Sequence, residues 1–466
     1  MILAVTILAI AAMTNCQESD YEPVKLFELA RHGARTSIHE TVKEAIIPGY
    51  EPGELTPNGE RMAYLLGKQI KLNYPGIFDK SFNVTHVEIR SSSKQRCIRS
   101  AISQILGILE LGDGENITPN EKANPRFYTP PIDGFNSSLS GAYALEEGYE
   151  YHNSIILQPN MDFTFFPNYQ LACPDLAKKV WATQQKMTDK YRSLGEGITN
   201  KLKAAGFDPN KLVGHDIYDT KDLFKMYDQM VTYENFYGKT FPGMNEDILK
   251  EMKLFGTLGF NSYLSEKDVR HIWNDNIARD IVKSFDENIS GKSGNRFVLY
   301  SGHDSNMQAF SYILKRTSLD CVVNLIKGTE SKEACDLFPS FLSNYIFELN
   351  KHKSSGIYFV RVLFENEPIK VCPDNTDVFY CKFDDFKDFM LNLVFYTKDD
   401  KMQVCGSQYF KSPAVQPIKR QLNTTGIVFI VIFAVIVVGL VGQFIYMTVK
   451  NKDIEIPAET YSVVVE

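Results

Sequence analysis

Three apolar segments of this chain end in the same way, and this repeated pattern limits the fold more than any other feature of the sequence. PVKLFELA (23–30) runs into RHGART, THVEIRSSS (85–93) ends in serines, and RFVLY (296–300) runs into SGHDSN. Short apolar runs bounded by polar residues are typical of buried strands. Helical patterns follow these segments, and this alternation predicts an α/β fold with a mainly parallel sheet.

The helical patterns also divide the chain into regions. Thr56 and Pro57 are typical of a helix start, and apolar residues then recur at helical spacing. Residues 94–111 predict a second helix. Between about 120 and 265, prolines and aromatics become frequent, no strand stands out, and helices are expected at 174–205 and 220–236. Further strands are expected at 343–349 and 356–364.

We therefore expect a three-layer α/β core with an inserted subdomain. The core is predicted to comprise residues 17–120 and 266–412. A mostly helical cap is predicted to comprise residues 121–265. No internal repeat and no low-complexity segment interrupts this plan.

Both ends of the chain are apolar. Residues 1–16 resemble a signal peptide, although no Lys or Arg precedes the apolar core. Residues 426–449 contain no charged residue and are long enough to span a bilayer, which needs about 20 residues. The sequence thus predicts a single-pass type I membrane protein with a juxtamembrane linker at 413–425 and a cytosolic tail at 450–466.

Other features fit a lumenal or extracellular location for the residues before this span. Five glycosylation sequons lie there, at Asn83, Asn116, Asn136, Asn288 and Asn423. Seven cysteines follow Cys16, and in an oxidising compartment most are expected to pair. The short separations suggest the pairs Cys321–Cys335 and Cys372–Cys381. The odd number leaves one cysteine free or intermolecular.

The net charge of the 466-residue chain is -7, which disfavours a nucleic-acid partner. A local anion site is still compatible with this charge. In an open parallel sheet, the carboxyl ends of the strands face the ligand crevice. Six side chains follow or end the predicted strands and are expected to converge there: Arg31, His32, Arg35, Arg90, His303 and Asp304.

Guanidinium and imidazole groups in one place suit a compact dianion such as phosphate, since arginine matches phosphate oxygens bidentately. A neutral His32 could attack phosphorus, and Asp304 could protonate the leaving alcohol. Gly33 is expected to let the backbone approach the phosphate. A second Gly-His-Asp triplet contains His215 and Asp216, which we interpret as loop or helix-cap residues.

With these motifs in their order, the chain resembles the histidine acid phosphatase family, in its lysosomal and prostatic acid phosphatase branch. The resemblance covers roughly residues 23–410 and rests on an ordered set of segments. These are RHGARTS, LTPNGERMAYLLGKQI, IRSSSKQRCIRSA, CPDL and VLYSGHDSN.

The resemblance implies that His32 is the nucleophile that forms a phosphohistidine and that Asp304 is the proton donor. Arg31, Arg35, Arg90 and His303 would bind phosphate, with no metal and no cofactor. The implied fold is a phosphoglycerate mutase-like core with a helical cap. The family pattern further implies a Cys173–Cys405 disulfide, with Cys97 as a free, buried thiol near the site.

The chain departs from the family pattern at two places. Ser37 stands where the family usually has proline, which could weaken affinity but removes no catalytic group. The segment SSSKQR lacks the acidic residue that the family commonly carries before the next arginine. This makes the site entrance more basic and could change which phosphoesters fit.

The leading functional hypothesis is therefore a membrane-anchored acid phosphatase that acts on small phosphomonoesters. A phytase-like or lysophospholipid phosphatase is the first alternative, and a catalytically idle receptor or adhesion protein is the second. Family resemblance leaves a homodimer open. Tyr461–Val464 fits a Tyr-x-x-apolar sorting signal, which favours endosomes or lysosomes but does not exclude the cell surface.

Overall fold

The fold is taken from a computed structural model, which describes part of the chain. The described residues are 20–80, 82–114, 116–117, 143–150, 154–156, 162–165, 173–214, 220–329, 334–372, 379–393 and 403–406, with Gln443 and Tyr446. The chain divides into two compact units, Met1–Phe410 and Lys411–Glu466. The account below concerns the first unit.

Several predicted segments lie outside the described residues. They are the signal peptide (1–16), the linker (413–425), the tail (450–466) and all of the predicted span (426–449) except Gln443 and Tyr446. No helix in the described part of the chain is long and apolar enough to cross a membrane. The anchor therefore stays a prediction.

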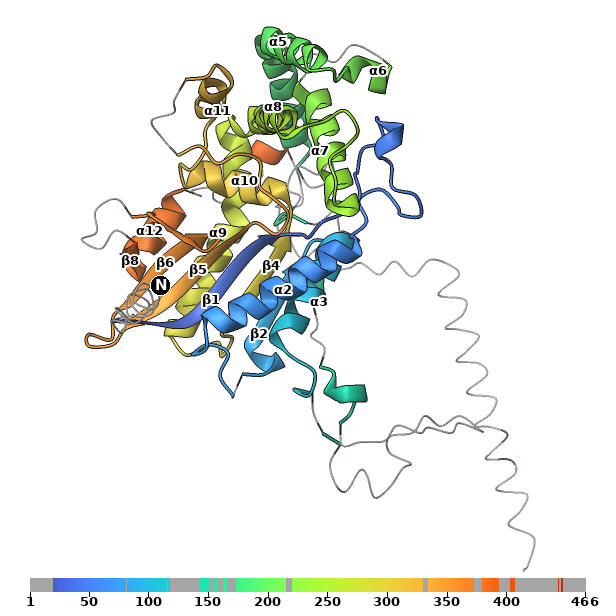
Figure 1. Cartoon of the computed structure of the whole chain (residues 1–466). Helices are drawn as coiled ribbons and strands as arrows, with labels where there is room; N and C mark the ends of the chain where they lie inside the picture. Colours follow the sequence, from blue (N-terminus) through green and yellow to red (C-terminus); the bar gives the residue numbers. More distant parts are fainter. Residues whose placement is uncertain are drawn as a thin grey trace, which may run out of the picture. The chain divides into compact units, whose positions relative to one another are not determined.

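Among the described residues, an eight-stranded sheet forms the centre of the first unit, in the order β3-β2-β4-β1-β5-β6-β7, with β8 paired to β6. Figure 1 labels its strands β1, β2, β4, β5, β6 and β8. The strands are β1 (Tyr21–Arg31), β2 (Val87–Ser91), β3 (Ser154–Ile156), β4 (Phe297–Gly302), β5 (Asn344–His352), β6 (Tyr358–Phe364), β7 (Glu367–Ile369) and β8 (Tyr380–Lys382). The strands from β3 to β1 are mutually parallel, and pairing is antiparallel from β1 onward to β5 and β6. The predicted α/β class is confirmed, with an antiparallel extension on one side.

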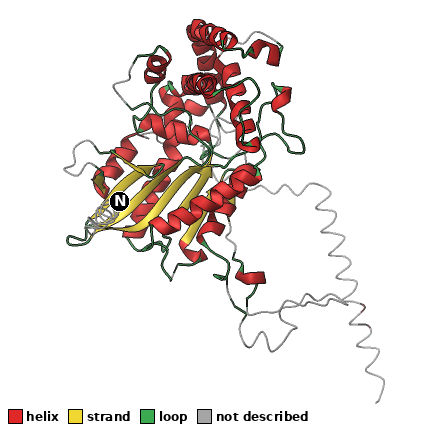
Figure 2. Cartoon of the chain, viewed as in Figure 1, coloured by secondary structure: helices red, strands yellow, loops and turns green. Residues whose placement is uncertain are grey.

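Helices cover both faces of this sheet (Figure 2). One face packs against α2 (Pro57–Asn73) and α3 (Gln95–Ile108), and the other against α9 (Lys267–Ile289), α10 (Asp304–Ile313) and α12 (Phe383–Leu393). Side chains alternate along β1 because successive residues of a strand point to opposite faces. Leu26 and Ala30 thus join the α2 and α3 side, while Phe27 and Leu29 join the α9 side.

Local sequence explains where α2 begins. The Thr56 hydroxyl accepts a hydrogen bond from the Gly59 amide at 3.2 Å, and Pro57 occupies the first turn. A proline there loses nothing, because the first amides of a helix have no intrahelical acceptor. The helix start predicted from Thr56 and Pro57 is therefore confirmed.

A second, separate apolar cluster lies in a helical region beside the sheet. It is formed by α5 (Pro174–Ala204), α6 (Pro209–Val213), α7 (Thr220–Tyr237) and α8 (Glu246–Leu264), together with α11 (Leu319–Ile326). The helices α5 and α7 match the ranges predicted from the sequence. The predicted cap boundaries at 121 and 265 stay a prediction, because most of residues 118–172 lie outside the described residues.

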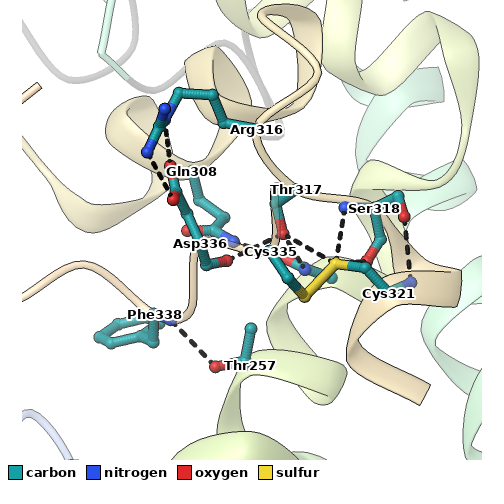
Figure 3. The surroundings of a disulfide bond; sticks show 10 residues. Thr257, Gln308, Arg316, Thr317, Ser318, Cys321, Cys335, Asp336 and Phe338 are labelled. Atoms are coloured by element: carbon teal, nitrogen blue, oxygen red, sulfur yellow. Dashed lines mark hydrogen bonds and ion pairs between the residues drawn. A yellow bond between two sulfur atoms is a disulfide. The ribbon is translucent and has the colours of Figure 1, made fainter. Parts of the chain in front are cut away.

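Three disulfides join described cysteines: Cys173–Cys405, Cys321–Cys335 and Cys372–Cys381. All three predicted pairings are therefore confirmed. Figure 3 shows the second, which ties α11 to the segment that contains Asp336 and Phe338. Cys97 is free and buried, as expected.

Among the predicted glycosylation sites, Asn83 and Asn116 are exposed and Asn288 is half-buried near the end of α9. Asn136 and Asn423 lie outside the described residues. Glycosylation itself stays a prediction.

Candidate active site

The candidate site lies at the carboxyl ends of β1, β2 and β4. Strand register places Arg31 beside Gly302 and Ser91 beside Ser301. Just past these pairs, the His32 amide donates to the Gly302 carbonyl at 3.1 Å. The chain segments that carry His32, Ser92 and His303 therefore leave the sheet at one level, as the sequence predicted for parallel strands.

His32 is almost fully buried, and its tautomer follows from one hydrogen bond. Its Nδ1 lies 2.9 Å from the Gly33 carbonyl oxygen. A carbonyl can only accept, so Nδ1 carries the proton and Nε2 carries the lone pair. Burial lowers the pKa of His32 well below its usual value, and the nearby Arg96, Arg31 and Arg35 lower it further. Burial and these three arginines therefore favour the neutral form of the imidazole.

His303 lies next to His32, with ring centroids 5.6 Å apart. Its Nε2 is 2.9 Å from the Ser92 hydroxyl, and its Nδ1 is 3.5 Å from an Arg96 Nη2. Burial, and then Arg96, hold the pKa of His303 well below its usual value. A guanidinium can only donate, so Nδ1 is best assigned as the acceptor and Nε2 as the protonated nitrogen.

Arg31 is held by a short segment that follows α11. Its Nη1 donates to the Pro339 carbonyl at 2.6 Å, and its guanidinium lies over the Phe341 ring, 4.3 Å from the centroid. Figure 3 shows how this segment is fixed: Arg316 pairs with Asp336, and the Phe338 amide donates to Thr257. The disulfide at Cys335 thus belongs to the support of Arg31.

Asp304 begins α10 and faces Arg31. One carboxylate oxygen lies 2.9 Å from Arg31 Nη2, and the other accepts the Ser305 amide at 2.9 Å. Arg31 Nη2 is nevertheless without a hydrogen-bond partner among the described residues, so this ion pair lacks hydrogen-bond alignment. At 16% exposed, Asp304 is more accessible than the 2% exposed Arg31 side chain.

Arg35 is buried and makes an ion pair that the sequence did not predict. Its two Nη atoms donate to the two carboxylate oxygens of Asp228 at 3.1 and 2.8 Å. Asp228 lies in the middle of α7, in the helical region. No sequence signal pointed to it, because a single aspartate on a helix far along the chain is indistinguishable from a surface residue.

The structure does not bring Arg90 to this cluster, which corrects the prediction that it follows the strand into the site. Arg90 is still within β2, and alternation turns it toward α9, opposite to Ile89 and Ser91. There it pairs with Asp280 at 3.0 Å and Glu88 at 3.1 Å and lies over the Tyr300 ring.

Arg96 lies in the cluster instead. It is in the first turn of α3, where the chain returns to the ends of the strands, and it is the largest charge influence on both histidines. The sequence did contain a signal for it, since Arg96 begins the helix that follows the polar end of β2. His215 and Asp216, the second triplet, lie outside the described residues.

The cluster contains buried guanidinium nitrogens that have no hydrogen-bond partner within the described ranges. They are Arg31 Nε and Nη2, Arg35 Nε and Arg96 Nε. Three arginines and two aspartates leave one net positive charge when both histidines are neutral. Buried unpaired donors are unfavourable unless a ligand uses them, so the cluster is suited to an anion.

Gly33 has a packing role that the sequence did not predict, while a close approach of its backbone to phosphate stays a prediction. A Cβ at this position would lie 2.4 Å from the Gly59 carbonyl oxygen, and the Gly33 amide donates to the Ser100 hydroxyl. Glycine is therefore required because the loop packs against the start of α2. Its amide is not available to a phosphate.

With this geometry established, comparison with known proteins gives the family. Residues 42–365 match the histidine phosphatase superfamily (branch 2). The chain belongs to this superfamily. The matched range begins after Arg35, so the placement of His32 in the site rests on the structure and the motif.

Individual relatives are distant. A lysosomal acid phosphatase from Xenopus laevis is 22% identical over 379 residues, covering 79% of this chain and 74% of the relative. A prostatic acid phosphatase from Rattus norvegicus is 23% identical over 351 residues, covering 72% and 77%.

Solved structures extend the similarity to the fold. A Klebsiella phytase superposes with a TM-score of 0.56 at 12% identity, covering 80% of this chain and 96% of the phytase. A phytase from D. castellii gives a TM-score of 0.52 at 14% identity, covering 84% and 82%. These likenesses support the histidine phosphatase fold and do not by themselves assign a substrate.

Proposed function

We propose that this protein is an acid phosphatase that hydrolyses phosphate monoesters through a phosphohistidine at His32. The supporting observation is a neutral imidazole with an Nε2 lone pair, placed among buried guanidinium nitrogens that lack partners. Such nitrogens are suited to the equatorial oxygens of a phosphoryl group in transfer. Arg31, Arg35, Arg96 and His303 are the proposed phosphate ligands.

In the proposed first step, His32 Nε2 forms a bond to phosphorus and the ester P–O bond breaks. Asp304 in its acid form gives its proton to the departing oxygen, which leaves as the alcohol. In the second step, Asp304 takes a proton from water as the water oxygen attacks the phosphohistidine. Inorganic phosphate and neutral His32 result, so the cycle closes without a metal or cofactor.

This mechanism favours acidic solution. The nucleophile must be neutral and the proton donor must be protonated at the same time. Because burial and the nearby arginines lower the pKa of His32, its neutral and nucleophilic form is favoured on the acid side as well. The pairing of these two states is the physical basis for an acid optimum.

We further propose a lumenal or extracellular location with a single membrane anchor. The three disulfides among described residues favour an oxidising compartment. The relatives named above are a lysosomal and a prostatic acid phosphatase, and the predicted signal peptide, sequons and apolar run at 426–449 fit a lysosomal membrane or the cell surface. A homodimer stays a prediction.

The test is hydrolysis of a phosphomonoester by the full-length protein between pH 3 and 8, without added metal. We expect activity on the acid side and a loss of at least 10³-fold in His32→Ala. Quenching in base should preserve a phosphohistidine in the wild-type protein only. A wild-type rate equal to that of His32→Ala would support the idle-receptor alternative instead.

A panel of substrates then separates the remaining alternatives. Aryl phosphate, inositol hexakisphosphate and lysophosphatidate represent the general phosphatase, the phytase-like enzyme and the lipid phosphatase. A kcat/KM for inositol hexakisphosphate far above that for the aryl phosphate would replace the general acid phosphatase with the phytase-like hypothesis.

A further inference from the structure

We propose that Asp228 is a positioning residue for Arg35 and that Ser37 completes this link. Helix α7 would thereby orient a phosphate-binding arginine in the segment after β1 (residues 32–42), called the nucleophile loop below. This inference rests on the proposed function. It assigns a role in the reaction to a residue of the helical region and to the serine that replaces the usual family proline.

The first step of the argument is the geometry of the ion pair. Asp228 binds Arg35 end-on, through both Nη atoms, at 3.1 and 2.8 Å. A second hydrogen of Nη1 is used by the Thr36 carbonyl at 2.9 Å. Arg35 is 2% and Asp228 4% exposed, so water does not readily replace these bonds.

The second step concerns the donors that remain. With the Nη1–Nη2 edge on Asp228 and the outer hydrogen of Nη1 on Thr36, Arg35 keeps the Nε hydrogen and one hydrogen of Nη2. These two point the same way and form a fork that matches two phosphate oxygens. Nε has no hydrogen-bond partner within the described part of the chain. Asp228 thus fixes which edge of Arg35 is offered to an anion.

Ser37 ties this carboxylate to the loop itself. Its hydroxyl donates to Asp228 Oδ2 at 3.1 Å and accepts the His39 amide at 2.9 Å. A proline at position 37 has no hydroxyl and could not make either bond. The departure from the family pattern therefore supplies Asp228 with a donor in addition to the two Arg35 nitrogens.

Electrostatics agree with a charged pair. Burial alone would lower the pKa of Arg35, but Asp228 raises it above its usual value. Burial would raise the pKa of Asp228, but Arg35 lowers it. Both groups therefore stay ionised at acidic pH, and the orientation persists where the enzyme is expected to work.

The neighbouring residue provides a matched control. Gln229 is equally buried and also anchors the loop: its Oε1 accepts the Thr41 and Val42 amides at 3.2 Å, and its Nε2 donates to the Val42 carbonyl at 3.1 Å. Within the described residues, no hydrogen bond joins Gln229 to Arg35. A merely structural role for α7 would affect both positions alike.

The experiment is a double-mutant cycle in the full-length protein, with kcat/KM for 4-nitrophenyl phosphate and the inhibition constant of inorganic phosphate as readouts. We expect Asp228→Ala to lower kcat/KM by about 10²-fold, as for a misplaced catalytic group. Ser37→Ala should lower it about tenfold, the low end for a hydrogen bond to a charged group, because the two Arg35 bonds still hold Asp228. In an Arg35→Lys background both effects should largely disappear, because lysine lacks the pair of N–H groups that Asp228 and Ser37 orient.

Gln229→Ala separates positioning from general support. Its effect should be the same in the wild-type and Arg35→Lys backgrounds. Thermal unfolding of each variant identifies any that fail to fold. If Asp228→Ala does not fold, Asp228→Asn replaces it, because asparagine keeps the shape of the side chain and one acceptor oxygen. Equal effects of Asp228→Ala in both backgrounds would overturn the inference while leaving the phosphatase function intact.

Failure of the function itself is distinguishable. If the wild-type protein does not hydrolyse the ester, the same cycle is measured as inorganic phosphate affinity by calorimetry. An effect of Asp228→Ala on phosphate affinity that disappears in the Arg35→Lys background would then support the positioning of Arg35 by Asp228 in a phosphate-binding protein. Absence of phosphate binding would overturn both proposals.

Discussion

Two buried, neutral histidines beside three arginines define the site at the scale of single residues. Burial is the largest influence on the pKa values of both His32 and His303, and Arg96 is the next. The arginines therefore have two effects: they provide donors for an anion, and they favour the unprotonated form of His32, the proposed nucleophile. Arg96 is central to both, although it lies on a helix and not at the end of a strand.

Arg96 and Arg90 make a direct test of this placement. We expect Arg96→Ala to lower kcat/KM by about 10²- to 10³-fold, the usual result of removing one preorganised donor. Arg90→Ala should leave kcat/KM within a few-fold of wild type and reduce the free energy of unfolding by about 1 kcal/mol, since its ion pairs are partly exposed. Steady-state kinetics and urea unfolding measure the two effects. A larger loss of kcat/KM in Arg90→Ala than in Arg96→Ala would show that Arg90, and not Arg96, belongs to the site.

The pH dependence gives a second residue-level prediction. Arg96 lowers the pKa of His32, so its removal should raise that pKa. Since the nucleophile is active only when neutral, the acid limb of kcat/KM in Arg96→Ala should move to higher pH than in wild type. Rate profiles between pH 3 and 8 measure the shift. An acid limb that stays in place would mean that His32 does not control it.

At the scale of elements, the nucleophile loop is held by close backbone packing. Gly33 and Gly59 face each other, and a Cβ on Gly59 would lie 2.1 Å from the Ala34 carbonyl oxygen. Neither backbone can retreat easily, because the loop continues from β1 and Gly59 lies in the first turn of α2. The position of His32 therefore depends on how α2 packs.

Gly33→Ala tests this packing. We expect it to reduce the free energy of unfolding by about 1–3 kcal/mol through overpacking and to lower activity as His32 moves. Gly197→Ala is the matched control: this glycine is at an exposed position of α5 with open space around it, and alanine should stabilise that helix by about 1 kcal/mol. Urea unfolding measures both. An unchanged free energy of unfolding in Gly33→Ala would show that the loop and α2 can move apart without loss of stability.

At the scale of the whole molecule, a buried carboxyl in the central strand links stability to pH. Glu28 lies on β1, is fully buried, and accepts from Gln104 Nε2 and Asn344 Nδ2 at 2.5 and 2.6 Å. Burial raises its pKa from 4.5 to about 7, although both hydrogen bonds oppose the rise. The folded protein therefore binds a proton that the unfolded chain has lost at neutral pH.

The sign of the resulting effect favours acid. The contribution of Glu28 is full below about pH 4.5 and is lost as the pH rises to about 7, a change of roughly 3 kcal/mol for this pKa difference. Urea unfolding between pH 4.5 and 7.5 should show this decline, and Glu28→Gln should flatten it. Glu22→Gln, at an exposed position of the same strand, serves as the control. An equally steep decline in Glu28→Gln would assign the dependence to other groups.

Much of the architecture could be predicted because it depends on local patterns. Alternating apolar runs and helical periodicities located β1, β2, β4, α2, α3 and α10, and parallel pairing then required His32 and His303 to meet. The disulfide pairs at Cys321 and Cys372 followed from short separations, while the Cys173–Cys405 pair came from family resemblance.

The sequence by itself thus determined the α/β class, the motif that contains His32, and the edge of the sheet where His32 and His303 meet, because strand period and chain order are local properties. Only the tertiary structure decided which arginines surround His32. Arg90 points away from the cluster because side chains alternate between the two faces of β2. Arg96 lies in the cluster because α3 begins beside the ends of the strands. Asp228 reaches Arg35 across 193 residues, and such a contact depends on how α7 packs, which no local pattern specifies.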